Sequence, residues 1–409
     1  MSWTNSKEAK CCSSNGMEEL SQDPLFEILN RLPFSSLLQC KCINKQFQLV
    51  ISDPRYLHCR LTHTQLSPPF QTNTLFLLFN FHLPSDYHHK THFSINSNNR
   101  THILKGSNFL PPSWSQDQDQ DQDRDGVRVK ASYHDLLLCS TQTDDYVHYF
   151  VCNPFTKHCV PLPPLSKSCT HELSRVGFMC DQSRSRFRVV HIPIICFEWV
   201  RSFKVNMYSS ETGKWGASIV PFSGHSEVLM SNSCFRNILV CDQKFVWWIN
   251  NDFLVCDPFV GTNSSWRVMN MYIPCKYSSD NKVECDIYNG TCNGRVKILE
   301  FSRQSSVCRV NELVHLEQGE WSSCHYFLDR QIGREININN MNLLAFHPHC
   351  EHIIYLYSNK GIFLCDYKNH KLESLYTALD EDFRIWGNLM SLVFPQCPTP
   401  LSIFNASKV

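Results

Sequence analysis

The hexapeptide His347-Pro-His-Cys-Glu-His352 is the densest group of potential metal ligands in the chain. Imidazole, thiolate and carboxylate groups all bind zinc, but a zinc site needs four ligands in a tetrahedral arrangement, and these usually come from two separated pairs. The sequence has no Cys-x-x-Cys pair that would supply the second half of such a site. We therefore interpret the segment as a turn between two strands and assign His88, His89 and His92 to a polar loop. We expect neither a metal nor a cofactor.

Motifs that activate a nucleophile or hold a phosphate are also missing from the sequence. It contains no G-x-S-x-G elbow, no G-x-x-x-x-G-K-[ST] loop and no dinucleotide-binding fingerprint, and its 14 glycines are not clustered. Trp247 and Trp248 lie inside a continuous apolar run, which favours a core position over a ligand-stacking surface. We expect a protein without catalysis of its own. The alternative is a hydrolase triad of dispersed Ser, His and Asp residues, which no spacing in the chain favours.

The bulk composition limits the partners and the environment. The 409 residues include 38 basic and 38 acidic side chains, so we expect no general attraction to nucleic acid or to an anionic membrane. No apolar run approaches the roughly 18 residues that span a bilayer. Residues 1–17 lack the apolar core of a secretory signal, and we expect them to be disordered. Most of the 22 cysteines stand singly in apolar runs, which is typical of reduced, buried thiols. These features predict a protein of the cytoplasm and/or nucleus.

Residues 20–57 contain three short amphipathic helical patterns separated by prolines. Asp23 is a favourable N-cap, and Pro24 stands at the first helical position, where its missing N–H costs nothing. Pro33 keeps the residue before it out of helical geometry and ends the first helix. Spacings of three and four residues place one apolar stripe on this helix: Leu25, Ile28, Leu29 and Leu32. The second and third patterns contain Leu37, Leu38, Cys40 and Ile43, then Phe47, Val50 and Ile51.

The order of residues in this block resembles the F-box, the adaptor-binding motif of ubiquitin-ligase substrate receptors. The resemblance is carried, in register, by Leu20, Asp23, Leu25, Ile28, Leu29, Arg31, Leu32, Pro33, Ser36, Leu37, Leu38, Lys41, Cys42 and residues 51–54. The block departs from the family pattern at Ser21, Pro24 and Phe47, where the family usually has Pro, an apolar residue that touches the adaptor, and Trp. The alternative is an ordinary three-helix cap on a larger domain.

This resemblance implies that residues 18–60 bind a Skp-type adaptor and, through it, a cullin and a RING subunit. The residues that it assigns to the adaptor contact are Leu20, Pro24, Leu25, Ile28, Leu29, Leu32, Pro33, Leu37, Leu38 and Cys42. A charged residue in place of Leu25 or Leu37 is then expected to abolish adaptor binding, because it would bury an unpaired charge.

Residues 61–130 are expected to connect this block to a second domain. They include the apolar run LFLLFNF at 75–81, which is typical of a buried strand. The stretch SQDQDQDQDRDG at 115–126 is acidic and of low complexity. Because it cannot bury apolar surface, we interpret it as a mobile loop. An acidic docking site for a partner is the alternative.

From residue 131 to residue 400 the chain alternates between short runs rich in β-branched and aromatic residues and short polar turns. Long amphipathic helical patterns are missing, which favours an all-β domain over an α/β fold. A crude unit recurs at 150–163, 254–269 and 363–376, in which a strand ends in Cys-Asn-Pro, Cys-Asp-Pro or Cys-Asp-Tyr before a turn and a second strand. Such repeats, closed in a ring, predict a β-propeller of about six four-stranded blades.

This second region resembles the F-box-associated, kelch-like domain of many plant F-box proteins. The resemblance is carried by residues 134–139 (HDLLLC), 151–157 (VCNPFTK), 162–163 (LP), 345–348 (AFHP) and 353–356 (IIYL). Together the two resemblances imply a multidomain α+β protein, with a small N-terminal three-helix F-box followed by a mainly-β, kelch-like propeller.

The implied role is a non-catalytic substrate receptor of a Skp–cullin–F-box ubiquitin ligase, which holds a target protein for ubiquitination and degradation. Two alternatives are open. One is an adaptor-bound scaffold without target turnover. The other is a propeller enzyme or sugar-binding module with a helical cap. No motif in the chain identifies the target protein.

Overall fold

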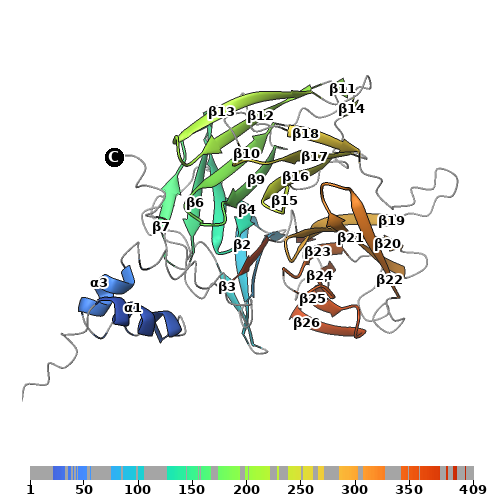
Figure 1. The fold of residues 1–409 in the computed structure, drawn as a ribbon. Helices are drawn as coiled ribbons and strands as arrows, with labels where there is room; N and C mark the ends of the chain where they lie inside the picture. Colours follow the sequence, from blue (N-terminus) through green and yellow to red (C-terminus); the bar gives the residue numbers. More distant parts are fainter. Residues whose placement is uncertain are drawn as a thin grey trace, which may run out of the picture. The chain divides into compact units, whose positions relative to one another are not determined.

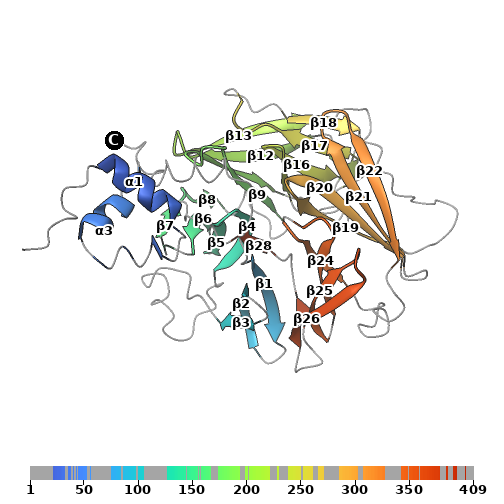
Figure 2. The same ribbon diagram turned by 60° about the horizontal axis from the view of Figure 1, so that its bottom comes forward.

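The computed structural model, drawn in Figure 1 and Figure 2, divides the chain into two compact units, Met1–Pro68 and Pro69–Val409. The described residues are 22–32, 36–37, 40, 43, 45–52, 56, 75–83, 86–97, 100–105, 127–143, 145–154, 156, 158–166, 174–193, 199–200, 202–221, 228–229, 238–249, 252–260, 266–270, 285–302, 307–327, 342–348, 350–358, 360–377, 384–385, 390–393 and 401. Within these ranges no helix is long and apolar enough to cross a membrane.

The first unit contains two described helices, α1 (Gln22–Arg31) and α3 (Lys45–Ser52). Helix α1 begins one residue before Asp23, so Asp23 lies within the helix rather than at the predicted N-cap, and Pro24 lies in the first turn, where a proline is tolerated. The helix ends before Pro33, as predicted. The expected middle helix lies largely outside the described residues. It stays a prediction, and so does the three-helix count.

The second unit is built from antiparallel sheets, and five of these sheets are blades whose first four strands lie side by side in the order in which they follow along the chain. Blade 1 contains β4 (Arg128–Tyr133), β5 (Leu136–Gln142), β6 (Tyr146–Asn153) and β7 (His158–Pro161), with β8 (Leu165–Ser166) paired to β6. Blade 2 contains β9 (Arg175–Cys180), β10 (Phe187–Ile192), β12 (Ser202–Ser209) and β13 (Lys214–Pro221). A separate ribbon pairs β11 (Trp199–Val200) with β14 (Val228–Leu229).

The remaining three blades follow in the same order along the chain. Blade 3 contains β15 (Leu239–Cys241), β16 (Lys244–Ile249), β17 (Asp252–Cys256) and β18 (Trp266–Asn270). Blade 4 contains β19 (Cys285–Cys292), β20 (Arg295–Ser302), β21 (Val307–His315) and β22 (Glu320–Phe327). Blade 5 contains β23 (Asn342–Phe346), β24 (Ile353–Ser358), β25 (Gly361–Asp366) and β26 (Lys371–Thr377). The first strands of neighbouring blades contact one another, β4 with β9, β9 with β15, β15 with β19 and β19 with β23.

The unit is therefore a mainly-β propeller with five such blades, and the predicted number of about six is wrong. A further sheet is composite, because it joins strands from both ends of this unit. It contains β1 (Leu75–Leu83), β2 (Asp86–Ser97), β3 (Arg100–Lys105), β27 (Arg384–Ile385) and β28 (Met390–Val393). His88, His89 and His92 lie in β2, so their assignment to a polar loop is also wrong.

Successive blades pack through apolar side chains on both faces of each sheet, because neighbouring residues of a strand point to opposite faces. In β10, Val189 belongs to the core between blades 1 and 2, whereas Val190 belongs to the core between blades 2 and 3. In β16, Trp247 lies between blades 2 and 3, and Trp248 lies between blades 3 and 4. The prediction that both tryptophans are core residues is confirmed.

The cysteines follow the predicted pattern with one departure. Six free cysteines are buried among the described residues, Cys139, Cys180, Cys241, Cys256, Cys292 and Cys365, and burial raises the pKa of each thiol for which a shift is resolved. Cys152 and Cys159, which face each other across β6 and β7, form a disulfide with a Cα–Cα distance of 4.3 Å. This pair was not expected from the sequence.

A buried polar pair lies in the core between blades 1 and 2. His191 of β10 and Asn206 of β12 are both buried, and their side-chain nitrogens Nδ1 and Nδ2 lie 3.3 Å apart. The other ring nitrogen, Nε2, is buried, and it has no hydrogen-bond partner among the residues that the structure describes. Burial lowers the pKa of His191 to about 4, and the cations of Lys130 and Lys204 contribute in the same direction. The folded protein therefore holds this imidazole neutral.

Acid should weaken the folded state through His191. Its pKa is below the ordinary value of about 6.5, so its contribution is fully present above that pH and is lost as the pH falls toward 4. We expect the unfolding free energy of the wild type to fall by on the order of 2 kcal/mol more than that of His191→Gln between pH 7.5 and pH 5. Urea unfolding at the two pH values measures this difference. Equal losses in the two proteins would contradict it.

Gly177 in β9 has a steric reason to be glycine. A Cβ atom at this position would lie 2.7 Å from Cγ2 of Ile238 and 2.8 Å from Cγ1 of Val190, so Gly177→Ala overpacks the core between blades 2 and 3. We expect a loss of about 1–3 kcal/mol in the free energy of unfolding. The matched control is Gly216→Ala in β13, where the nearest atom to an added Cβ is 3.8 Å away. Thermal melts of both variants test the prediction, which is wrong if the two shift equally.

Candidate functional site

The predicted adaptor-binding residues do not share one environment in the helical unit. Leu25, Leu29 and Leu37 are buried in the core of the unit, together with Phe47, Val50, Ile51 and Tyr56. Leu32 packs against this core and is partly buried. Ile28 is exposed. Leu20, Pro33, Leu38 and Cys42 lie outside the described residues, and Pro24 is described only as part of α1.

The burial of the stripe changes the meaning of the predicted Leu25 and Leu37 variants. A charge at either position would enter the core of the helical unit itself, so lost adaptor binding would also report unfolding. Phe47, which replaces the usual Trp, belongs to the same core, so this departure affects packing within the unit. The adaptor contact of the buried residues stays a prediction.

Exposed apolar side chains give a sharper candidate surface on the helical unit. Ile28 on α1 is 52% exposed, Ile43 is 67% exposed and Leu49 on α3 is 73% exposed. The sequence pattern placed Ile28 and Ile43 on apolar helix faces. It gave no indication of Leu49, which is not among the apolar positions predicted for the third helix. Exposed apolar side chains are typical of a partner-binding surface where they gather into one patch, and we take these three as the candidate residues of such a surface.

A second candidate region lies at one end of the propeller blades. In an antiparallel blade, the turns after the first and third strands lie at the same end of the sheet, and we call the end that carries these turns the turn face. Several of these turns contain left-handed residues, including Asp242-Gln243 and Asn293-Gly294, in which both residues have positive φ. Two-residue turns of this kind match the twist of a hairpin.

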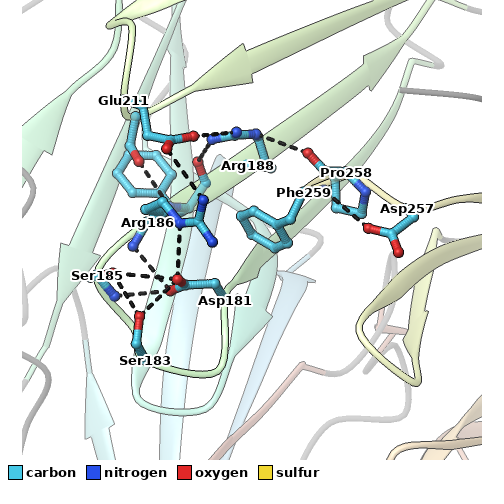
Figure 3. Close-up of polar contacts among 11 residues, drawn as sticks. Asp181, Ser183, Ser185, Arg186, Arg188, Glu211, Asp257, Pro258 and Phe259 are labelled. Carbon is cyan, nitrogen blue, oxygen red and sulfur yellow. Dashed lines mark hydrogen bonds and ion pairs between the residues drawn. The ribbon is translucent and has the colours of Figure 1, made fainter. Parts of the chain in front are cut away.

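Asp181 organises the β9–β10 turn on the turn face (Figure 3). Its carboxylate accepts hydrogen bonds from the backbone N–H groups of Ser185 (2.9 Å) and Arg186 (3.1 Å), from the Ser183 hydroxyl (2.8 Å) and from Nε of Arg186 (3.0 Å). Burial alone would raise the pKa of Asp181, but these hydrogen bonds outweigh it and hold the pKa below its usual range. The carboxylate is therefore ionised and fixes the shape of the turn.

Two arginines connect this turn to the next blade (Figure 3). Glu211, in the β12–β13 turn, accepts from Arg188 at 2.5 Å and from Arg186 at 3.3 Å, and the bond from Arg188 is the main cause of its lowered pKa. Nε of Arg188 donates to the carbonyl of Pro258 in blade 3 at 3.1 Å. The Phe259 ring lies 5.4 Å from the guanidinium of Arg186 and 5.1 Å from that of Arg188. This cluster links blades 2 and 3.

Similar polar links join the other blades on the turn face. Arg184 of blade 2 lies 3.6 Å from the buried carboxylate of Asp135 in blade 1, which also accepts from Asn153 at 2.9 Å. Blades 3 and 4 are linked by Glu317, which pairs with Lys244 and Arg267. In these contacts each charged side chain lies beside a group of opposite charge. Together the contacts hold the turns in place.

The His347–His352 segment forms the β23–β24 turn, as predicted. The backbone N–H of Cys350 donates to Nδ1 of His347 at 2.9 Å, and Nε2 of His352 lies 3.7 Å from the Asp366 carboxylate. His349 lies outside the described residues. Among the described residues, no group of three or more His, Cys, Asp or Glu side chains is placed to hold a metal ion.

Family comparisons match both units. A profile described as "F-box protein At3g26010-like, beta-propeller" matches residues 107–391, which is more than half of the chain, and an F-box domain profile matches residues 17–59. A comparison with curated proteins gives no match.

Solved structures with a related arrangement are distant. A mutant of AofleA from Arthrobotrys oligospora is 8% identical, with 75% of this chain and 83% of that chain covered and a TM-score of 0.38. A post-proline cleaving enzyme from Rickettsia typhi is 10% identical, with 88% and 61% covered and a TM-score of 0.37. The acylaminoacyl peptidase of Pyrococcus horikoshii is 9% identical, with 75% and 51% covered and a TM-score of 0.36. Because these scores are low, we draw nothing about function from them.

Replacing the carboxylate at Asp181 should loosen the turn that holds the arginines. Asp181→Asn keeps the shape of the side chain, but its NH2 group would face the N–H and O–H donors that now bind the carboxylate. We therefore expect a loss of about 1–3 kcal/mol in the free energy of unfolding at pH 7. Since the pKa of Asp181 is lowered, the wild type loses this advantage as the pH falls through the folded-state pKa, below its ordinary range. The gap between the two proteins should therefore close in acid.

Urea titrations of both proteins at neutral and acidic pH measure this gap. Glu211→Gln is the control: its carboxylate is partly exposed, so its loss should stay below about 1 kcal/mol. A gap for Asp181→Asn that is constant with pH would show that the carboxylate charge does not stabilise the turn.

Proposed function

Because the chain belongs to the family of At3g26010-like F-box proteins with a β-propeller, we propose that it is the substrate receptor of a Skp–cullin–F-box ubiquitin ligase. In this proposal the helical unit binds a Skp-type adaptor and, through it, a cullin and a RING subunit. The propeller binds a target protein for ubiquitination and degradation. The complex would act in the cytoplasm and/or nucleus.

The observation that carries the proposal is the presence of both modules in one chain. The F-box match ends at residue 59 and the propeller match begins at residue 107, so neither uses the residues of the other. A helical module that binds an adaptor and a β domain that binds a second protein are the two contacts that a receptor needs. A receptor of this kind supplies effective concentration rather than bond chemistry, because the bound target meets the charged ubiquitin carrier as if within one molecule.

The polar contacts of the turn face support a binding role for the propeller. Asp181, Glu211 and Glu317 are held by arginine or lysine side chains, which fix the turns that carry them. Loops held on a rigid scaffold are the usual arrangement for recognition.

Adaptor binding should depend on the exposed apolar residues of the helical unit. Ile28→Lys places a charge on the surface of α1 rather than in the core, so the unit stays folded while the apolar contact is lost. We expect the affinity for a Skp-type adaptor to fall at least about tenfold, as for a central interface residue. Calorimetry with the full chain and a purified adaptor measures the change.

The matched control is Val260→Lys, which charges an apolar residue of similar exposure, 65%, in the propeller. Its adaptor affinity should equal that of the wild type. A wild type that does not bind the adaptor refutes the receptor proposal. If the adaptor binds but the complex never associates with a neddylated cullin, a scaffold without target turnover becomes the better explanation.

A further inference from the structure

The disulfide of blade 1 joins two neighbouring strands. Cys152 of β6 and Cys159 of β7 are register partners, and their Cα atoms lie 4.3 Å apart. β7 is the outer strand in the sheet order β4-β5-β6-β7 (Figure 1). The disulfide therefore ties an edge strand to the rest of its blade.

The two cysteines of this bond differ in their access to solvent. Cys152 is fully buried, whereas Cys159 is partly exposed. Thiol–disulfide exchange requires a thiolate to reach one of the two sulfur atoms. A small thiol in solution therefore meets the bond from the side of Cys159.

The six buried free cysteines of the described blade strands are placed differently. Each is covered by the packing of the blades, and none has another cysteine as its register partner. Compared with these six, the pair in blade 1 combines a partner sulfur with access from solvent. Blade 1 is therefore the place where a change of redox state can alter the fold.

Without the disulfide, β7 is weakly held. It has four residues, of which Val160 is buried while His158 and Pro161 are exposed. Pro161 also has no N–H group to donate to the strand ladder. Segments with few buried apolar contacts and exposed backbone hydrogen bonds open at low free energy. We therefore expect the attachment of β7 to depend on the disulfide.

A buried polar contact next to the disulfide connects β7 to blade 2. Asn153 pairs in register with His158 and donates from Nδ2 to the Asp135 carboxylate at 2.9 Å. Its side-chain oxygen accepts from the backbone N–H of Thr156, in the β6–β7 turn, at 3.2 Å. The Asp135 carboxylate also lies 3.6 Å from Arg184 of blade 2. Opening of β7 would disturb Asn153 and, through Asp135, the β9–β10 turn.

We propose that the Cys152–Cys159 bond is a thiol–disulfide exchange site, which a low-molecular-weight thiol reduces, and the corresponding disulfide re-forms, in the folded protein. Because the bond ties β7 to β6, its redox state sets how firmly the β6–β7 turn is held. This inference goes beyond the receptor function. It fits the compartment proposed above, since the disulfides of cytosolic proteins are usually transient and catalytic or redox-sensing.

The reduction consists of two displacements. In the first, the small thiolate attacks Sγ of Cys159, the bond between the two cysteines breaks, and its electron pair leaves with the sulfur of Cys152, which takes a proton from water. Cys159 then carries a mixed disulfide. In the second, another small thiolate attacks the sulfur of the added group and releases Cys159 as a thiol. Two small thiols are oxidised to one disulfide while the protein gains two thiols.

The first test traps the mixed disulfide on the full chain, with oxidised glutathione as the probe. Cys152→Ser keeps the accessible cysteine and Cys159→Ser keeps the buried one, so the two variants are matched. Peptide mapping by mass spectrometry should find at least about tenfold more glutathione on Cys159 of the first variant than on Cys152 of the second. Equal labelling of the two, or no labelling of Cys159, would overturn the proposal.

The second test uses the wild type, so it does not depend on how the variants fold. As the ratio of reduced to oxidised glutathione rises, alkylation and mass spectrometry should show Cys152 and Cys159 passing together from disulfide to thiols. Hydrogen exchange at the β7 amides should become at least about tenfold faster in the reduced protein and stay unchanged in β26.

Three outcomes of the second test would refute the exchange site. They are a pair that stays reduced at every ratio, a bond that glutathione reduces only after urea unfolds the chain, and hydrogen exchange in β7 that is the same in both redox states. Neither test involves the adaptor, so a failure here leaves the receptor function unaffected, and a chain that does not bind the adaptor leaves the exchange site unaffected.

Discussion

Every blade of the propeller depends on the blade beside it to cover an apolar sheet face. Val189 and Val190 are neighbours in one strand, yet each is buried in a different core, because their side chains point to opposite faces of blade 2. Trp247 and Trp248 show the same division in blade 3. A single blade would expose both of its faces to water, so none of the sheets can be stable alone and the unit folds as an assembly of sheets.

The polar contacts of the turn face follow from this packing. Apolar contact between two sheets is not directional, so it leaves the relative rotation of the blades weakly defined. The pairs of Arg184 with Asp135, Arg188 with Glu211 and the Pro258 carbonyl, and Lys244 with Glu317 are directional and cross from one blade or turn to the next. They fix the positions of the turns, and the outer strands are then free to differ from blade to blade.

The sequence predicted features that depend on residues close together in the chain. It was less informative about contacts between residues that are far apart in the chain. The Cys-Asn-Pro and Cys-Asp-Pro hairpins and the core position of the two tryptophans follow from short patterns, and the structure contains them. The predicted number of blades was wrong because β1 pairs with β28, near the other end of the unit, and both strands belong to the composite sheet. No repeated sequence pattern indicates such a pairing. In the helical unit, periodicity showed that Leu25 and Leu29 share a face, but it cannot tell whether that face meets a partner or the core. The exposure of Leu49 depends on which surfaces the rest of the unit leaves uncovered, and only the folded chain shows this.

The composite sheet has a consequence for synthesis of the protein. Leu75 pairs with Val393, so β1 leaves the ribosome long before the strand that completes its sheet has been translated. Until then one edge of β1 has no partner strand, and such edges favour pairing with other chains. Pairing between segments so distant in sequence is also slow, because closing a long loop costs entropy before the contact forms. Completion of the last strands is therefore the step that commits the nascent chain to its native sheet order.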